Sequence, residues 1–281
     1  MREHDLFSAD GTRITAWRTG HDGPDVLLSP GLGAVPAAWP DLPATVHSWH
    51  HRGTLGSDRP EDESRIGLSD HVADALAVLD DAKVHRCVVM GWSMGVPVAV
   101  ELAVRHPERV AGLLLVAGVP GDSFTGVLPS VVPADLRRLL GVTTARALRA
   151  AGPLLDGVLH RVPLPDLALT APLKRFLKHD WRWYFTLALA LGEAPRPATH
   201  RVTCPTTVLI GRYDLLANPA SVLEQTAALP QARVRLLPNT HFLPLENPAV
   251  VREELRLLLR RADTVDQALD DLLTSRSRPR A

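Results

Sequence analysis

The feature that most constrains the fold is the stretch 91–95, Gly-Trp-Ser-Met-Gly, which follows the short apolar run Cys87-Val88-Val89-Met90. Such a run predicts a buried strand, and the G-x-S-x-G pattern is typical of a strained strand-to-helix turn that exposes a serine hydroxyl. The next segment, Met94 to Arg105, is apolar almost all round and predicts a buried helix. Pro97 falls in the first turn of that helix, where its missing N–H is tolerated. The pattern therefore predicts a buried strand, a sharp turn at Ser93 and a buried helix.

Strand-like and helix-like segments alternate on both sides of this turn. The expected strands cover residues 13–18, 26–29, 45–49, 87–90, 110–116, 206–210 and 234–237. The expected helices among them cover residues 70–79, 94–105, 220–228 and 250–260. Alternation of this kind indicates an α/β fold with a mostly parallel, twisted sheet and helices on both faces. With 281 residues the chain can bury a full core, so one large α/β unit is the simplest interpretation.

The alternation stops between residues 121 and 200. This segment is rich in Leu, Pro and Ala, and helical stretches are expected near residues 134–140, 144–159 and 173–191. We interpret it as a helical cap inserted between two strands of the sheet. The core is then expected to comprise residues 1–120 and 201–262, whereas residues 263–281 are expected to form a frayed tail.

Five further motifs accompany the turn at Ser93. Residues 30–33 read Pro-Gly-Leu-Gly, residues 52–60 run from Arg-Gly to Ser-Asp-Arg-Pro, and residues 106–110 read His-Pro-Glu-Arg-Val. Residues 211–214 read Gly-Arg-Tyr-Asp, and residues 240–246 read Thr-His-Phe-Leu-Pro-Leu-Glu. In these motifs the chain resembles the α/β-hydrolase superfamily, in particular its branch of esterase-like and lipase-like enzymes with a serine nucleophile.

The resemblance covers roughly residues 12–120 and 202–261, so it implies an α/β-hydrolase fold and leaves the cap open. Two departures are visible. Pro30 stands where many members of the superfamily have His, and His51 stands near a position where an Asp often precedes the Arg-Gly pair.

A Ser–Asp–His set can be traced on this framework. A serine hydroxyl becomes a good nucleophile when an imidazole takes its proton, and a carboxylate holds that imidazole in the right tautomer. In this fold the three residues follow the chain order Ser, acid, His, which selects Ser93, Asp214 and His241. Asp214 and His241 each follow an expected strand, at the edge where ligands bind in open α/β sheets. Two alternatives stay open: Asp122 as the acid, and Asp214 as a residue that only caps a turn.

Backbone N–H groups are expected to complete the site. Those of Met94, directly after the serine, and of Leu32, in the early glycine loop, are candidates for an oxyanion hole. Trp92 beside the nucleophile and Trp183 in the cap are candidate pocket residues. Simple packing explains Trp92 equally well. Trp183 belongs to the aromatic segment 181–185, which could form a lid over the site or the packed underside of a cap helix. We favour packing for this segment, although both roles can hold at once.

Several classes of function are not indicated. The 31 basic and 31 acidic residues balance, so no electrostatic footprint for nucleic acid exists. No apolar run reaches the roughly 20 residues of a membrane span, and the polar first residues do not resemble a signal peptide. Cys87 and Cys204 are expected to be reduced core residues in a cytoplasmic protein. Neither a metal-ligand cluster nor a dinucleotide motif is present, so we expect no metal and no cofactor.

The leading hypothesis is a serine hydrolase that cleaves a hydrophobic carboxylic ester, or a related acyl compound, through an acyl-enzyme on Ser93. The apolar cap predicts an apolar small-molecule substrate. Lactonases, thioesterases, C–C hydrolases and cofactor-free perhydrolases share such a triad, and a non-catalytic ligand-binding relative is the alternative from another class. A basic group on the cap (Lys174, Arg175 and Lys178) would suit a carrier protein, or be a solvated helix face.

Overall fold

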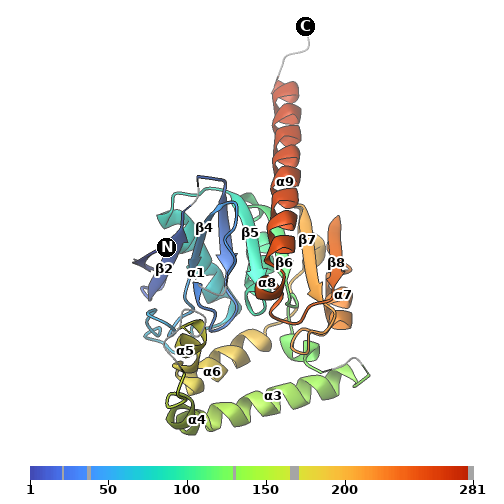
Figure 1. The fold of residues 1–281 in the computed structure, drawn as a ribbon. Helices are drawn as coiled ribbons and strands as arrows, with labels where there is room; N and C mark the ends of the chain where they lie inside the picture. The colour runs from blue at the N-terminus through green and yellow to red at the C-terminus, as the bar shows by residue number, and fades with distance from the viewer. Residues whose placement is uncertain (21, 37–38, 129–130, 165–170, 278–281) are drawn as a thin grey trace.

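An eight-stranded sheet forms the centre of the molecule, in the order β1-β2-β4-β3-β5-β6-β7-β8 (Figure 1). The computed structural model describes residues 1–20, 22–36, 39–128, 131–164 and 171–277. The strands are β1 (Arg2–Phe7), β2 (Arg13–Thr19), β3 (Asp25–Ser29), β4 (Thr45–Trp49), β5 (Cys87–Trp92), β6 (Val110–Val116), β7 (Thr206–Gly211) and β8 (Ala232–Leu237). β1 and β4 each pair antiparallel with β2, and the other neighbours are parallel. The predicted α/β fold class is confirmed.

Helices cover both faces of the sheet, and others lie beyond one of its ends. The helices of the described residues are α1 (Leu68–Asp81), α2 (Gly95–Arg105), α3 (Ala134–Ala150), α4 (Gly152–Leu159), α5 (Ala171–Leu177), α6 (Trp181–Gly192), α7 (Pro219–Thr226), α8 (Leu243–Glu246) and α9 (Pro248–Ser277). Successive strand side chains point to opposite faces. Leu27 and Val89 pack with apolar residues of α1, α2 and α7, whereas Leu28 and Met90 pack with α9. Each fully buried Leu, Val or Met contributes about 1.5–3 kcal/mol, so these two layers hold β5 in place.

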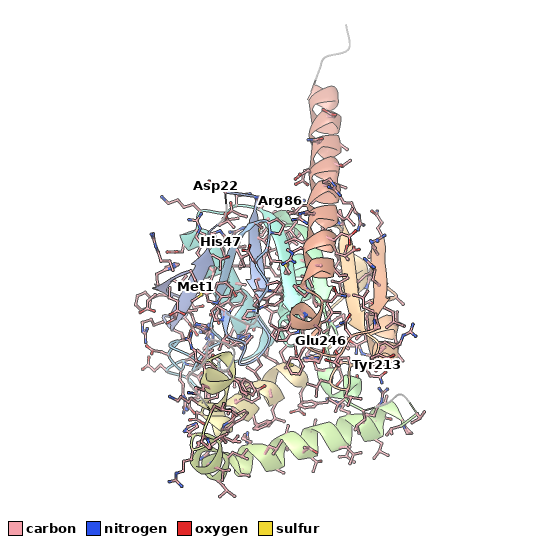
Figure 2. The ribbon with its side chains drawn as sticks, in the orientation of Figure 1. Met1, Asp22, His47, Arg86, Tyr213 and Glu246 are labelled. Atoms are coloured by element: carbon pink, nitrogen blue, oxygen red, sulfur yellow. The ribbon has the colours of Figure 1, made fainter. Side chains whose placement is uncertain are left out.

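The four helices α3 to α6 lie together beyond one end of the sheet (Figure 1). Figure 2 shows which end this is, because Tyr213 and Glu246 lie on the side of these helices whereas Asp22 and Arg86 lie toward the opposite side. Tyr213 follows the carboxyl end of β7, and Arg86 precedes β5. The loops that follow the parallel strands therefore face α3–α6, and no strand is assigned to the described residues between 121 and 200.

Two expected helical stretches of this region are divided differently in the structure. α3 continues through Gly141 to Ala150, and the break falls before Pro153, which lacks the N–H that a continuous helix would need. The stretch 173–191 is two helices, because the Asp180 side chain accepts a hydrogen bond from the Trp183 N–H at 2.8 Å and begins a new helix there. The residues 129–130 and 165–170 of the expected cap lie outside the described residues.

The structure corrects the expectation of a frayed tail over most of residues 263–281. α9 continues to Ser277 instead of ending near Arg260, and it projects beyond the sheet away from α3–α6 (Figure 1). The physical reason is that residues 249–278 contain neither Gly nor Pro, so nothing in the sequence interrupts the helix. Residues 278–281 of the expected tail lie outside the described residues. β1 was also not expected from the sequence; it pairs with β2 as an antiparallel edge strand.

Both cysteines are free and buried, and burial raises the pKa of Cys87 to about 12 and that of Cys204 to about 11. None of the helices in the described part of the chain combines the length and apolarity needed to cross a bilayer.

Candidate active site

The turn between β5 and α2 holds Ser93 in a left-handed conformation, with φ at 53°. Its N–H donates to the Val116 carbonyl at 3.0 Å, which ties the turn to β6. A Cβ atom on Gly95 would lie 2.1 Å from the Ser29 carbonyl oxygen, so only glycine lets α2 start this close to β3. Ser93 therefore lies in a tight turn, with its hydroxyl at the carboxyl end of β5.

Ser93, His241 and Asp214 lie in hydrogen-bond contact although they are far apart in the chain. The Ser93 hydroxyl donates to His241 Nε2 at 2.8 Å. In the tautomer with its proton on Nδ1, His241 donates to Asp214 Oδ2 at 2.9 Å. The structure thus brings together all three residues that the sequence selected, in the order nucleophile, base and carboxylate.

Asp214 is only 2% exposed and has its own backbone partners. Its Oδ1 accepts hydrogen bonds from the N–H groups of Leu216 and Ala217 at 2.9 and 2.8 Å. The residue therefore caps a turn and also contacts His241. Asp122, the alternative acid, is instead paired with Arg138 at 3.1 Å.

The two expected oxyanion donors lie on the same cavity. Leu32 and Met94 line it together with Ser93 and His241. Neither backbone N–H donates a hydrogen bond to another residue of the described chain. Two N–H groups beside a serine hydroxyl can stabilise negative charge on a bound oxygen, and such donors contribute about 3–4 kcal/mol each.

A buried pair of histidines contacts the glycine loop 30–33, and the sequence did not predict this contact. His51 Nε2–H donates to the Pro30 carbonyl at 3.0 Å, and His51 Nδ1 lies 3.3 Å from His71 Nδ1. Burial lowers the pKa of His51 to about 4 and also lowers that of His71. Both rings are therefore neutral near pH 7, and His51 anchors the peptide two residues before Leu32. The sequence showed His51 only as a departure from the superfamily pattern.

Trp92 and Trp183 do not line the cavity, which corrects their assignment as pocket residues. Trp92 Nε1 donates to the His241 carbonyl at 3.2 Å and thereby supports the loop that carries the histidine. Trp183 Nε1 donates to the Arg52 carbonyl at 2.8 Å and fixes α6 to the core. Simple packing explains both tryptophans.

Other residues of the cap region form the roof and wall of the cavity. Tyr184 of α6 lies over the glycine loop, with its hydroxyl 3.5 Å from the Leu32 carbonyl oxygen, and burial raises its pKa to about 12. Phe124, in the short helix Ser123–Gly126 after β6, forms part of the wall. The cavity has a volume of about 160 Å³. The aromatic segment 181–185 indicated a lid or a packed helix, whereas no sequence signal marked Phe124.

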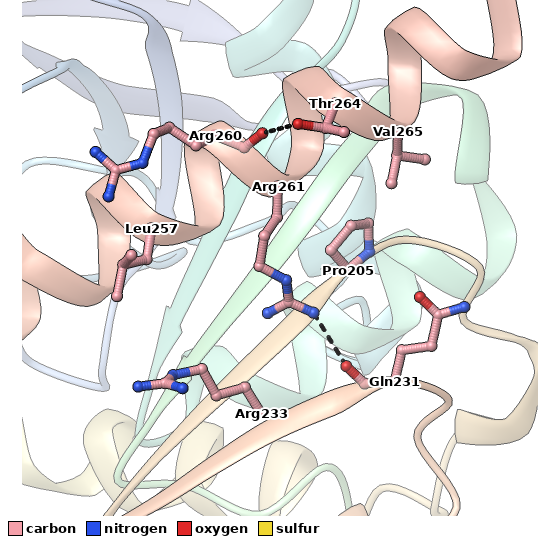
Figure 3. Close-up of a pocket in the computed structure, with 8 residues that line it drawn as sticks. All are labelled: Pro205, Gln231, Arg233, Leu257, Arg260, Arg261, Thr264 and Val265. Carbon is pink, nitrogen blue, oxygen red and sulfur yellow. Dashed lines mark hydrogen bonds between the residues drawn. The ribbon is translucent and has the colours of Figure 1, made fainter.

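A larger hollow of about 410 Å³ lies between α9 and β8 (Figure 3). Arg233, Arg260 and Arg261 line it, and Arg261 donates to the Gln231 carbonyl at 3.1 Å. Its described lining residues include neither serine nor histidine, so no Ser–His pair like that of Ser93 and His241 lies there. Across the described ranges, no group of three or more His, Cys, Asp or Glu residues is arranged to hold a metal ion.

The sheet order, the turn at Ser93 and the loops at the carboxyl ends of the strands define the architecture of an α/β hydrolase. A family model described as alpha/beta hydrolase fold matches residues 26–248. The chain therefore belongs to the α/β-hydrolase fold family, and the resemblance seen in its motifs is confirmed.

Individual relatives are distant. A putative carbamate hydrolase of Variovorax paradoxus is 37% identical over 102 residues, which cover 34% of this chain and 38% of the relative. A pimeloyl-[acyl-carrier protein] methyl ester esterase of Nitrosospira multiformis is 24% identical over 249 residues, which cover 79% and 89%. The crystal structure of an enol-lactonase from Burkholderia xenovorans superposes with a TM-score of 0.69 at 23% identity, covering 92% of this chain and all of the lactonase.

The chain spans only part of the length of several curated relatives. For three of them, including the carbamate hydrolase, the shares are 30%, 38% and 62%. The relatives share the fold of this chain.

Proposed function

We propose that this chain is a serine hydrolase that cleaves a carboxylic ester or a related acyl bond of an apolar small molecule. The observation that carries the proposal is the continuous hydrogen-bonded line from the Ser93 hydroxyl through His241 to Asp214. Two backbone N–H groups that have no acceptor among the described residues lie on the same cavity as the serine. This combination suits attack on a carbonyl group.

The proposed reaction has two halves. His241 Nε2 takes the proton of Ser93 while Oγ attacks the carbonyl carbon, and Asp214 stabilises the imidazolium that forms. The Leu32 and Met94 N–H groups stabilise the tetrahedral oxyanion. The alcohol leaves with the proton from His241, and His241 then activates a water that cleaves the acyl-enzyme.

A fluorophosphonate probe and a set of p-nitrophenyl esters test the proposal. We expect wild type to be labelled and to hydrolyse an ester, and Ser93→Ala to lose both properties; the loss of turnover is expected to approach 10⁶-fold, as for other serine nucleophiles. Ser123 lines the same cavity and is the matched control, so Ser123→Ala should stay labelled. An unlabelled wild type would favour a ligand-binding protein without turnover, and an unaffected Ser93→Ala variant would refute the proposed nucleophile.

A carrier protein as the source of the acyl group is a second candidate. A groove of about 390 Å³ runs between the loop 53–55 and α5, and Arg175 and Lys178 line it. Basic side chains beside a groove suit a phosphate-bearing prosthetic arm. We expect Arg175→Ala and Lys178→Ala to slow hydrolysis of a carrier-bound acyl thioester and to leave p-nitrophenyl ester hydrolysis unchanged. Equal effects on both substrates would exclude a carrier-specific contact.

A further inference from the structure

Phe124 fills a space that could otherwise belong to the cavity. Its side chain lies at the wall of the cavity that contains Ser93 and His241, and it also packs against the apolar cluster between α3 and α6. The ring therefore separates the nucleophile from the interior of the helical layer. A side chain in this place sets how far a substrate can extend.

Two glycines make room for this ring. A Cβ atom on Gly141 of α3 would lie 2.8 Å from Phe124 Cδ1, and one on Gly192 of α6 would lie 2.6 Å from Phe124 Cε2. Distances this short mean that any other residue at either position would push the ring. The ring is thus held between two helices, and Gly192 lines the cavity itself.

The remaining volume is small. Substrate pockets of enzymes commonly measure about 300–1,000 Å³, whereas this cavity measures about 160 Å³. A cavity of about 150 Å³ accepts benzene, which has about six non-hydrogen atoms. The space beside Ser93 therefore matches a carbonyl group with a chain of a few carbons.

The acyl group is the part of the substrate that must fit this space. It stays covalently attached to Ser93 through both halves of the proposed reaction, whereas the alcohol leaves after the first half. A small cavity at the nucleophile therefore constrains the acyl chain more than the alcohol.

We propose that Phe124 limits the acyl chain, so that the substrates are esters of short-chain carboxylic acids of about four carbons. This inference rests on the proposed hydrolase function. Truncation of the ring opens a second space of about benzene size, which is enough for several more methylene groups. Each methylene that becomes buried favours the longer substrate by about fourfold.

A chain-length profile tests the inference, with p-nitrophenyl esters of two, four, six, eight and ten carbons. We expect wild-type kcat/KM to peak near four carbons and Phe124→Ala to raise the ratio of eight-carbon to four-carbon kcat/KM at least about tenfold. Phe185 of α6 packs in the same cluster without lining the cavity, so Phe185→Ala is the matched control and should keep the wild-type profile. In the opposite direction, Gly192→Ala should push the ring inward and shift the peak toward two carbons.

The outcomes are separable. A profile that Phe124→Ala leaves unchanged, or that Phe185→Ala shifts equally, overturns the role of Phe124 while hydrolysis itself persists. A wild type that hydrolyses none of the esters overturns the proposed function together with this inference. If Phe124→Ala fails to fold, Phe124→Leu opens a smaller space, and the absence of any shift in that variant overturns the inference in the same way.

Discussion

The strained backbone of Ser93 predicts that the nucleophile position lowers the stability of the fold. A left-handed conformation costs an L-residue about 1–2 kcal/mol, whereas glycine adopts it without that cost. Glycine also loses about 0.4–1 kcal/mol through the greater freedom of the unfolded chain. The balance makes Ser93→Gly more stable than Ser93→Ala by about 0.5–1 kcal/mol. Both variants lose the hydroxyl that donates to His241, so this loss cancels in the comparison.

Chemical denaturation at equilibrium measures this difference, and a thermal melt provides a second readout. A chain of this size shifts its Tm by about 2–4 °C per kcal/mol, so the two variants should differ by about 1–4 °C. Ser123 is the control, because it lies in a short helix and is not among the residues with positive φ. At this position the order should reverse, with Ser123→Gly less stable than Ser123→Ala. A Ser93→Gly variant no more stable than Ser93→Ala would refute the reasoning.

Three further predictions concern the carboxylates and the buried histidine. Asp214→Asn should lower kcat by about 10⁴-fold because the imidazole loses its orienting acceptor, whereas Asp122→Asn should change kcat little; steady-state kinetics decide between them. Asp74→Ala removes a partner of Arg52, whose side chain is 0% exposed, and should lower the free energy of unfolding in urea by about 3–5 kcal/mol. Burial lowers the pKa of His51 to about 4, so the unfolded chain takes up this proton first as the pH falls. The free energy of unfolding should therefore decline from about pH 6.5 to about pH 4, by about 3 kcal/mol for this residue. In His51→Gln, the Tm measured by thermal melts should depend less on pH across that range.

The sheet, and the contact of Ser93 with His241 and Asp214, could be predicted from the sequence because their signals are local. The apolar run 87–90 and the glycines around Ser93 state the strand, the turn and the helix within a few residues. Asp214 and His241 were found because each follows a strand, and the carboxyl ends of parallel strands meet at one edge.

The cavity could not be read in this way, because its shape depends on contacts between distant helices. The position of Phe124 depends on Gly141 and Gly192, and no spacing in the sequence links these three residues. His51 is a similar case, since its carbonyl partner Pro30 precedes it by 21 residues in another loop. α9 is longer than the helix expected over residues 250–260, because no Gly or Pro interrupts residues 249–278 and the chain stays helical.

The direction of α9 has a practical consequence for how the protein is handled. The helix leaves the body of the molecule on the side opposite α3–α6, which lie next to the cavity (Figure 1). A surface, bead or fluorescent label attached after Ser277 would therefore stand off from the body by the projecting part of the helix. Immobilisation through this end should leave α3–α6 facing away from the support, and it offers a simple orientation for a biosensor or a flow reactor.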